Sequence, residues 1–221
     1  MRAKQATSPA LEDCPATAKP EQDLDIEGAI HFHGHWCPGL AIGIRVAEVA
    51  LAVIGPHSSD EEVVAIVEAD NCAVDAIQYF TGCTFGKGNL IHRDYGKNVF
   101  TFLRRSDGKA IRVTLRPEAR SETSPDHREL QSKVQSGRAT TEETQRVAEF
   151  RKQRIESILT QPADELLRVE RVSVPMPRKA QIRRSVICER CGESTMETRV
   201  RILGGKPYCL PCYRTIEDDS V

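Results

Sequence analysis

The chain has 221 residues and a hydrophobic content of 39%, which is enough to bury a core in one large domain or two small ones. Its 31 Lys and Arg residues nearly balance its 32 Asp and Glu residues, so no overall field attracts it to nucleic acid or to an anionic membrane. The longest apolar stretch, 39–55, is too short to cross a bilayer, and the N-terminus has no hydrophobic signal region. We therefore expect a soluble, cytoplasmic protein without a membrane partner.

Composition divides the chain into four segments. Residues 1–22 are polar and contain three prolines, which indicates a flexible segment. Residues 23–117 have the pattern of a globular core. In 118–185, apolar residues first recur at roughly helical intervals and then give way to a basic, proline-containing linker, whereas 186–221 form a separate small unit. The helices of this connector suit either a link between two domains or a clasp on a second copy of the chain.

Apolar periodicity in the core predicts both helices and strands. Helices are expected over 24–32, from Pro38 to about Gly55, and over 73–82. The β-branched run 62–69 predicts a buried strand, and two alternating segments, 97–104 and 109–116, flank an Asp-Gly turn that is typical of a hairpin. The predicted fold class is therefore α+β.

Two C-x-x-C pairs near the C-terminus are the most specific motif in the chain. Cys188 and Cys191 form the first pair, and Cys209 and Cys212 form the second after 17 intervening residues. Four thiolates at this spacing satisfy the tetrahedral geometry of zinc and leave no open position. The intervening segment alternates around Gly204-Gly205 like a hairpin. We predict a structural Zn²⁺ site here.

Histidines and a cysteine at the start of the core form a second cluster. His31, His33 and His35 alternate, so an extended backbone would place all three on one side. Cys37 follows just before a predicted helix, where the helix dipole favours its thiolate. The pattern predicts a metal site or a reactive thiol, and the competing interpretation is that these histidines satisfy core hydrogen bonds and the cysteine is a small hydrophobe.

A glycine-rich segment, 81–89, follows the third predicted helix. Its glycines surround Cys83 and Lys87, so backbone amides and one positive charge are available to an anion. Lys87 and Asn89 are the candidate residues for binding an anionic group. The segment lacks the spacing of a P-loop, because Gly88 occupies the position of the hydroxyl residue.

Three strings in the core resemble a known family. HFHGHWCPGLAIGIRVAEVAL, VEADNCAVDAIQYFTGCTFGKGNL and RDYGKNVFTF occur in order and are similar to the FmdE-like domain, which is named for a component of formylmethanofuran dehydrogenase, over about 25–117. Some members of that family carry a C-terminal zinc finger of treble-clef type, which the two C-x-x-C pairs resemble. The resemblance implies an α+β core, a homodimer and a site formed by His35, Cys37, Asp70 and Cys72.

The resemblance also limits the expected role. Catalysis by the parent molybdenum or tungsten pterin complex is assigned to its other subunits, so an accessory protein or a small metal-dependent enzyme is expected, with oxidoreductase subunits as possible partners. Our leading hypothesis is that His35, Cys37 and Cys72 bind Zn²⁺ or another transition metal. If one coordination position stays open, His33 or Asp70 would carry protons, so that Cys37, His33 and Asp70 are the catalytic candidates.

Two alternatives remain open from the sequence. In the first, the finger and its basic linker bind nucleic acid or act as a regulatory module while the core senses a metal or metabolite; the near-neutral charge does not favour it. In the second, Cys37 and Cys72 act as a thiol redox sensor.

Overall fold

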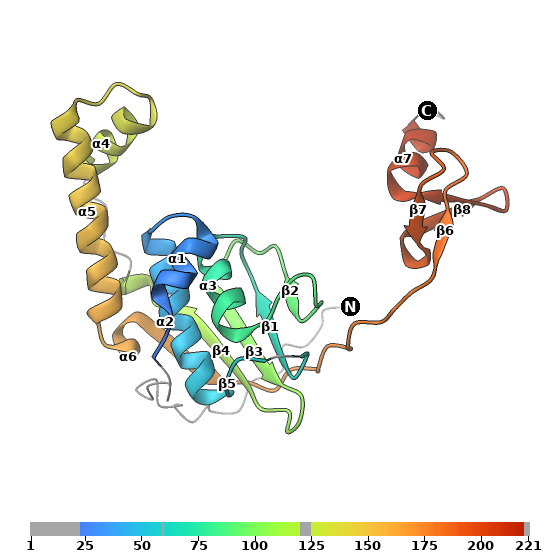
Figure 1. Cartoon of the computed structure of the whole chain (residues 1–221), viewed down its shortest axis with the longest axis horizontal. Helices are drawn as coiled ribbons and strands as arrows, with labels where there is room; N and C mark the ends of the chain where they lie inside the picture. Colours follow the sequence, from blue (N-terminus) through green and yellow to red (C-terminus); the bar gives the residue numbers. More distant parts are fainter. Residues whose placement is uncertain (1–22, 59, 120–124, 219–221) are drawn as a thin grey trace, which may run out of the picture. The chain divides into compact units, whose positions relative to one another are not determined.

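A computed structural model describes residues 23–58, 60–119 and 125–218 (Figure 1). The segment 1–22, for which flexibility was predicted, lies outside the described residues. The chain is divided into two compact units, Met1–Lys179 and Ala180–Val221, which are described separately below. Within the described residues, no helix is both long and apolar enough to span a membrane.

The first unit is built on a five-stranded mixed sheet with the strand order β2-β1-β3-β4-β5. Only β1 and β2 are parallel, and every other neighbouring pair is antiparallel. The α+β class, the buried strand and the hairpin are confirmed, and Gly108 supplies the positive φ, 71°, in the turn. The strands are β1 (Val63–Val67), β2 (Leu90–His92), β3 (Val99–Arg104), β4 (Ala110–Leu115) and β5 (Leu167–Arg171).

Three helices lie on one side of this sheet (Figure 1). They are α1 (Ile26–His33), α2 (Pro38–Val53) and α3 (Cys72–Thr81), which confirm the three predicted helices within a few residues. Helices α2 and α3 pack against the strands, and α1 packs on these two helices. Phe100 and Phe102 of β3 point into the layer between helices and sheet and are fully buried. Apolar residues of α2 and α3 complete this core, so both helices are held by the hydrophobic effect.

Two glycines of α2 allow it to approach α3 closely. A Cβ added at Gly43 would lie 2.4 Å from the carbonyl oxygen of Ala73 and 2.6 Å from its Cα. A Cβ added at Gly39 would lie 2.8 Å from Cβ of Cys72. The N-terminal ends of the two helices are therefore brought together, because no side chain separates them there.

The region expected as a helical connector also contributes to the first unit. It contains α4 (Pro125–Gln135), α5 (Thr141–Thr160) and two short helical turns, η1 (Pro117–Ala119) and α6 (Ala163–Leu166). The C-terminal half of α5 buries Ile155 and Ile158 in the main core, next to α2. β5 then pairs with β4 as the edge strand, which was not predicted from the sequence because only Leu167 and Val169 mark its inner face.

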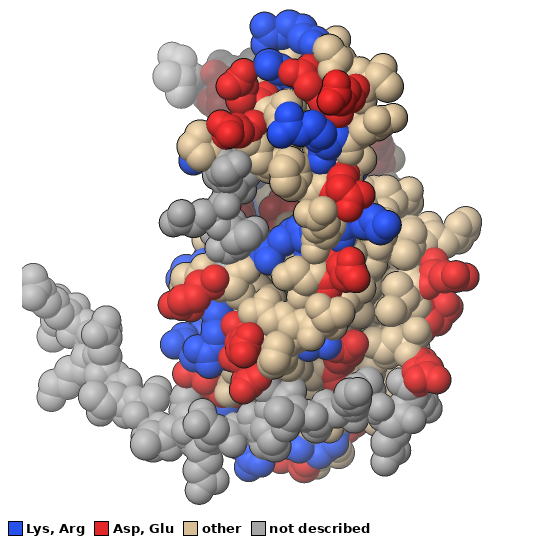
Figure 2. Space-filling model, turned by 90° about the vertical axis from the view of Figure 1, so that its left-hand side faces the viewer, with Lys and Arg blue, Asp and Glu red and all other residues tan. Residues whose placement is uncertain are grey.

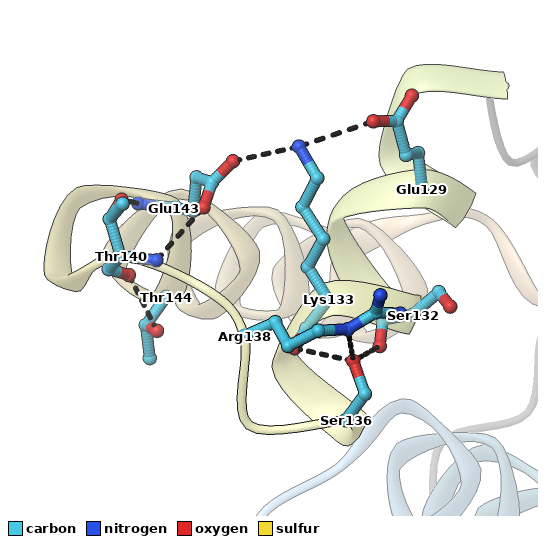
Figure 3. A network of polar contacts seen from close by, with 8 residues as sticks. All are labelled: Glu129, Ser132, Lys133, Ser136, Arg138, Thr140, Glu143 and Thr144. Carbon is cyan, nitrogen blue, oxygen red and sulfur yellow. Dashed lines mark hydrogen bonds and ion pairs between the residues drawn. The ribbon is translucent and has the colours of Figure 1, made fainter.

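The hairpin of α4 and α5 is held by polar contacts (Figure 3). Lys133 on α4 bridges Glu129, at 3.1 Å, and Glu143 at the start of α5, at 3.0 Å. Glu143 also accepts a hydrogen bond from the backbone amide of Thr140, whose side chain accepts one from the amide of Glu143. This reciprocal capping box fixes the start of α5.

The second unit is a pair of small hairpins followed by a helix. Its elements are β6 (Ser185–Ile187), β7 (Ser194–Met196), η2 (Glu197–Arg199), β8 (Val200–Leu203), β9 (Lys206–Cys209) and α7 (Leu210–Asp218). The predicted hairpin turn is confirmed, since Gly204 and Gly205 both have positive φ, 56° and 77°. Among the described residues of this unit, only Cys188 and Cys209 are buried, so it has almost no hydrophobic core of its own.

Candidate metal centres

The histidine cluster is arranged by the end of a helix and not by an extended strand. α1 continues to His33 and ends at Gly34, whose φ of 91° turns the chain and whose amide donates to the carbonyl of Ile30. The expectation of an extended backbone over HFHGH is therefore wrong. His31 lies on the exposed surface of α1, outside the group of donors that His33 and His35 join.

The two cysteines of the core site lie at the starts of neighbouring helices. Cys37 is the N-cap of α2, and its sulfur accepts a hydrogen bond of 3.3 Å from the amide of Leu40. Cys72 is the first residue of α3, which is capped by Asn71. Both sulfurs therefore lie beside the free backbone amides of a helix N-terminus.

Four side chains converge at this point of the core. The nitrogen and sulfur donor atoms of His33, His35, Cys37 and Cys72 all lie within 4.8 Å of one another. Sγ of Cys37 is 3.7 Å from Nε2 of His33, and the two imidazole rings have centroids 4.4 Å apart. Donors around a tetrahedral ion lie about 3–4 Å apart, because zinc–ligand bonds are about 2.0–2.3 Å long. The donor set therefore fits a metal ion without a large rearrangement.

Electrostatics at the site favour a cation between the sulfurs. Burial raises the pKa of Cys72, and the hydrogen bond and charge of the neighbouring Cys37 sulfur raise it further. Two thiolates beside each other repel in a partly buried setting, whereas a divalent cation neutralises both. The arrangement of Cys37 and Cys72 therefore favours coordination of a metal ion over two adjacent thiolates without one.

The carboxylate that contacts a donor of this group is Asp75, which was not predicted from the sequence. Asp70, the predicted proton carrier, is exposed, and neither aspartate is one of the four donors. Asp75 lies 2.7 Å from Nδ1 of His33, whose side chain is only 8% exposed. The sequence carried a signal for this contact, because Asp75 follows Cys72 by three residues and so lies on the same face of a helix.

The glycine-rich segment uses its polar groups inside the protein. The side chain of Asn89 is fully buried and joins the amide of Thr84, at 3.0 Å, to the carbonyl of Val63, at 2.9 Å. Lys87 donates to the carbonyl of Ser58 at 3.0 Å. The thiol of Cys83 is buried and donates to Val63. These contacts tie the segment to Val63 of β1 and to Ser58 before it, so both predicted anion-binding side chains make hydrogen bonds within the protein.

The four cysteines of the second unit form the other donor group. The sulfurs of Cys188, Cys191, Cys209 and Cys212 lie within 4.8 Å of one another, which fits a zinc finger. The backbone amides of Cys191 and Cys209 donate to Cys188 and lower its pKa to about 6. The hydrogen bond with Cys209 raises the pKa of Cys212 to about 12. Cys188 is therefore favoured as a thiolate, whereas Cys212 requires the positive charge of a bound ion to lose its proton.

Charge on the described surface does not favour a nucleic-acid site. In the second unit, Arg184 pairs with Glu197 and Lys206 pairs with Glu189, each at 2.5 Å, so two of the basic side chains face carboxylates. On the face of the first unit seen in Figure 2, blue and red side chains alternate among the described residues. Neither observation matches the continuous basic face expected for phosphate binding.

Comparisons with known proteins agree with this division of the chain. Residues 32–168 match the model of a family described as "FmdE, Molybdenum formylmethanofuran dehydrogenase operon". Residues 181–218 match the prokaryotic dksA/traR C4-type zinc finger, the segment that holds the four cysteines.

Two relatives extend the comparison. The solved structure of a tungsten formylmethanofuran dehydrogenase FmdE-like protein from Syntrophus aciditrophicus is 27% identical, with a TM-score of 0.54 over 85% of this chain and 89% of that chain. A probable S-adenosyl-L-methionine-binding protein from Archaeoglobus fulgidus is 39% identical over 191 residues. That match covers 83% of this chain but only 51% of the archaeal protein, so the chain spans about half the length of this relative.

Proposed function

Because this chain belongs to the FmdE family, whose model matches more than half of its length, we propose that it is a metal-binding accessory protein of molybdenum or tungsten oxidoreductase metabolism. The observation that carries the proposal is the convergence of His33, His35, Cys37 and Cys72 on one point. The family description names a molybdenum enzyme operon, and the solved relative is named after a tungsten enzyme. Both names support the link to these oxidoreductases.

The donor chemistry supports a soft or borderline divalent ion in the core. Two thiolates and two neutral imidazoles balance the charge of such an ion, and this mixture suits zinc while also suiting nickel or cobalt. His33 is proposed as a ligand instead of a proton carrier, because Asp75 occupies its Nδ1 while its Nε2 lies near the sulfur of Cys37. When bound, the ion supplies Lewis acidity.

The two histidines differ in a way that bears on activity. The side chain of His33 is almost buried, whereas His35 is exposed and makes no side-chain hydrogen bond to the described residues. Coordination by all four donors would close the shell, and loss of His35 alone would open one position to an incoming molecule. We therefore propose His35 as the exchangeable ligand, and expect His35→Ala to retain metal that His33→Ala loses.

The second unit is proposed to bind one structural Zn²⁺ and to act as a docking module. A closed four-sulfur site has no exchangeable ligand and cannot activate water. Exposed apolar side chains on its hairpins, Ile187, Met196 and Ile202, support contact with a protein partner. Nucleic-acid binding is not proposed, since the basic residues Arg184 and Lys206 are paired.

Two partners belong to the proposal: oxidoreductase subunits and a second copy of the chain. The name of the family supports association with oxidoreductase subunits. The exposed Phe150, on the N-terminal half of α5 that packs against α4, supports contact with a second copy of the chain. Light scattering during gel filtration tests the homodimer, and co-purification with proteins from the same operon tests the other association. We base no proposal on S-adenosyl-L-methionine, because the match spans only half of the archaeal relative.

The decisive experiment is metal analysis of the full chain. Elemental mass spectrometry of the wild type should find two equivalents of metal, and Cys37→Ala should retain one. Cys83→Ala is the matched control, since this buried thiol donates to a backbone carbonyl and lies outside both donor groups. One equivalent in the wild type, unchanged in Cys37→Ala, would contradict the core metal site.

A further inference from the structure

Both nitrogens of the His33 ring face polar groups of this chain. Nδ1 lies 2.7 Å from Oδ2 of Asp75, and Nε2 lies 3.7 Å from Sγ of Cys37. The side chain of His33 is 8% exposed, so the protein and not solvent determines what its nitrogens contact.

The contact with Asp75 selects one tautomer of the neutral ring. An ionised carboxylate only accepts hydrogen bonds, so the proton must reside on Nδ1. The lone pair of Nε2 then points toward the sulfur side of the site, where it can bind a metal ion. A carboxylate in this position also makes the imidazole more basic and holds the plane of its ring.

Asp75 is itself held in place. Its Oδ1 lies 3.4 Å from Nε2 of Gln78, one turn further along α3. Oε1 of Gln78 accepts a hydrogen bond of 3.3 Å from the backbone amide of Phe85. A chain of contacts therefore runs from the metal donors through His33, Asp75 and Gln78 to the segment that follows α3.

We propose that Asp75 is a positioning residue that commits His33 to metal binding through Nε2, with Gln78 orienting the carboxylate. The inference rests on the proposed metal site in the core. It assigns the two aspartates that flank Cys72 to different roles, since Asp75 contacts Nδ1 of His33 whereas Asp70 is exposed. Asp70 therefore provides a matched control on the same segment.

The first test measures the tautomer in the full chain without metal. Nitrogen-15 NMR of histidine, at a pH well above the ordinary imidazole pKa, should show His33 protonated at Nδ1 in the wild type and in Asp70→Ala. In Asp75→Ala, the Nε2-protonated form that the side chain of histidine prefers in water should become populated. An unchanged tautomer in Asp75→Ala would overturn the proposal, and this readout does not depend on metal or activity.

The second test measures affinity for Co²⁺ or Zn²⁺ by competition with a chelating dye. We expect Asp75→Ala to weaken core binding about 10–100-fold, Asp75→Asn to weaken it less, and Asp70→Asn to leave it unchanged. Equal affinity in Asp75→Ala and wild type would overturn the positioning role. A wild type that binds no core metal would instead overturn the proposed function, so the two failures are distinguishable. Amide NMR spectra of each variant exclude unfolding as the cause.

Discussion

Replacing Gly43 with alanine tests whether the close contact between α2 and α3 builds the core site. In an isolated helix this change would be stabilising by about 1 kcal/mol, because alanine has the better helix propensity. Here the added Cβ would lie 2.4 Å from the carbonyl oxygen of Ala73 and 2.8 Å from Cβ of Ala76. To reach an ordinary contact of about 3.4 Å, one helix must move by about 1 Å.

Backbone atoms cannot rotate out of the way as a flexible side chain can. Overpacking costs about 1–3 kcal/mol, and the upper part of that range, about 2–3 kcal/mol, applies where the obstacle is backbone. After subtraction of the gain in propensity of about 1 kcal/mol, we expect Gly43→Ala to lower the free energy of unfolding by about 1–2 kcal/mol. Separation of the helices should also weaken core metal binding, because Cys37 and Cys72 start α2 and α3 respectively.

Urea unfolding followed by fluorescence measures this effect directly. The single tryptophan, Trp36, packs partly buried against the core beside the site and so reports on its integrity. Gly86→Ala is the control, since an added Cβ there meets nothing within 4 Å, and its stability should change by less than about 0.5 kcal/mol. A Gly43→Ala protein as stable as the wild type would refute the close-contact explanation.

Other parts of the structure give three further predictions. Removing zinc with a chelator should collapse the amide dispersion of 180–221 in NMR spectra while 23–179 stays folded, because metal supplies most of the folding free energy of a unit with so little core; retained dispersion would contradict this. Asn89→Ala should lower the free energy of unfolding by about 2 kcal/mol or more without changing metal content, since the amide of Thr84 loses its acceptor and the carbonyl of Val63 keeps only the weak thiol donor of Cys83; unchanged stability in urea would argue against this structural role. The amide of Thr140 lowers the pKa of Glu143 below 4.5. The capping box therefore protects the backbone amides at the start of α5 from hydrogen exchange above pH 4.5, and this protection is lost as pH falls through the folded pKa. Glu143→Gln should remove the pH dependence of exchange, and a pH dependence that persists would assign it to another group.

The elements that the sequence predicted well are those with a strong local signal. The apolar faces of α2, the Asp-Gly turn before β4 and the paired cysteines of the finger depend on neighbours in the chain. β5 was missed because five residues with two inward apolar side chains, Leu167 and Val169, carry too little periodicity to be recognised. Its place in the sheet depends on pairing with β4, which is remote in sequence.

The site shows the same division. From the sequence alone, His35, Cys37 and Cys72 were predicted as metal ligands with His33 as a proton carrier, and the spacing of the four C-terminal cysteines predicted a zinc site. The structure adds His33 to the group of donors. Only the structure shows which aspartate contacts the site, since Asp75 on α3 lies beside His33 whereas Asp70, before α3, is exposed.

Donor type, helix capping and turn preference can be predicted from the sequence, because each depends on residues a few positions apart. The convergence of two segments some forty residues apart cannot be predicted in this way, because it depends on how closely α2 and α3 pack. Only the tertiary structure shows that two glycines of α2, Gly39 and Gly43, permit that approach, and that the side chains of Lys87 and Asn89 serve the fold. Long-range packing decides which of the suitable residues meet.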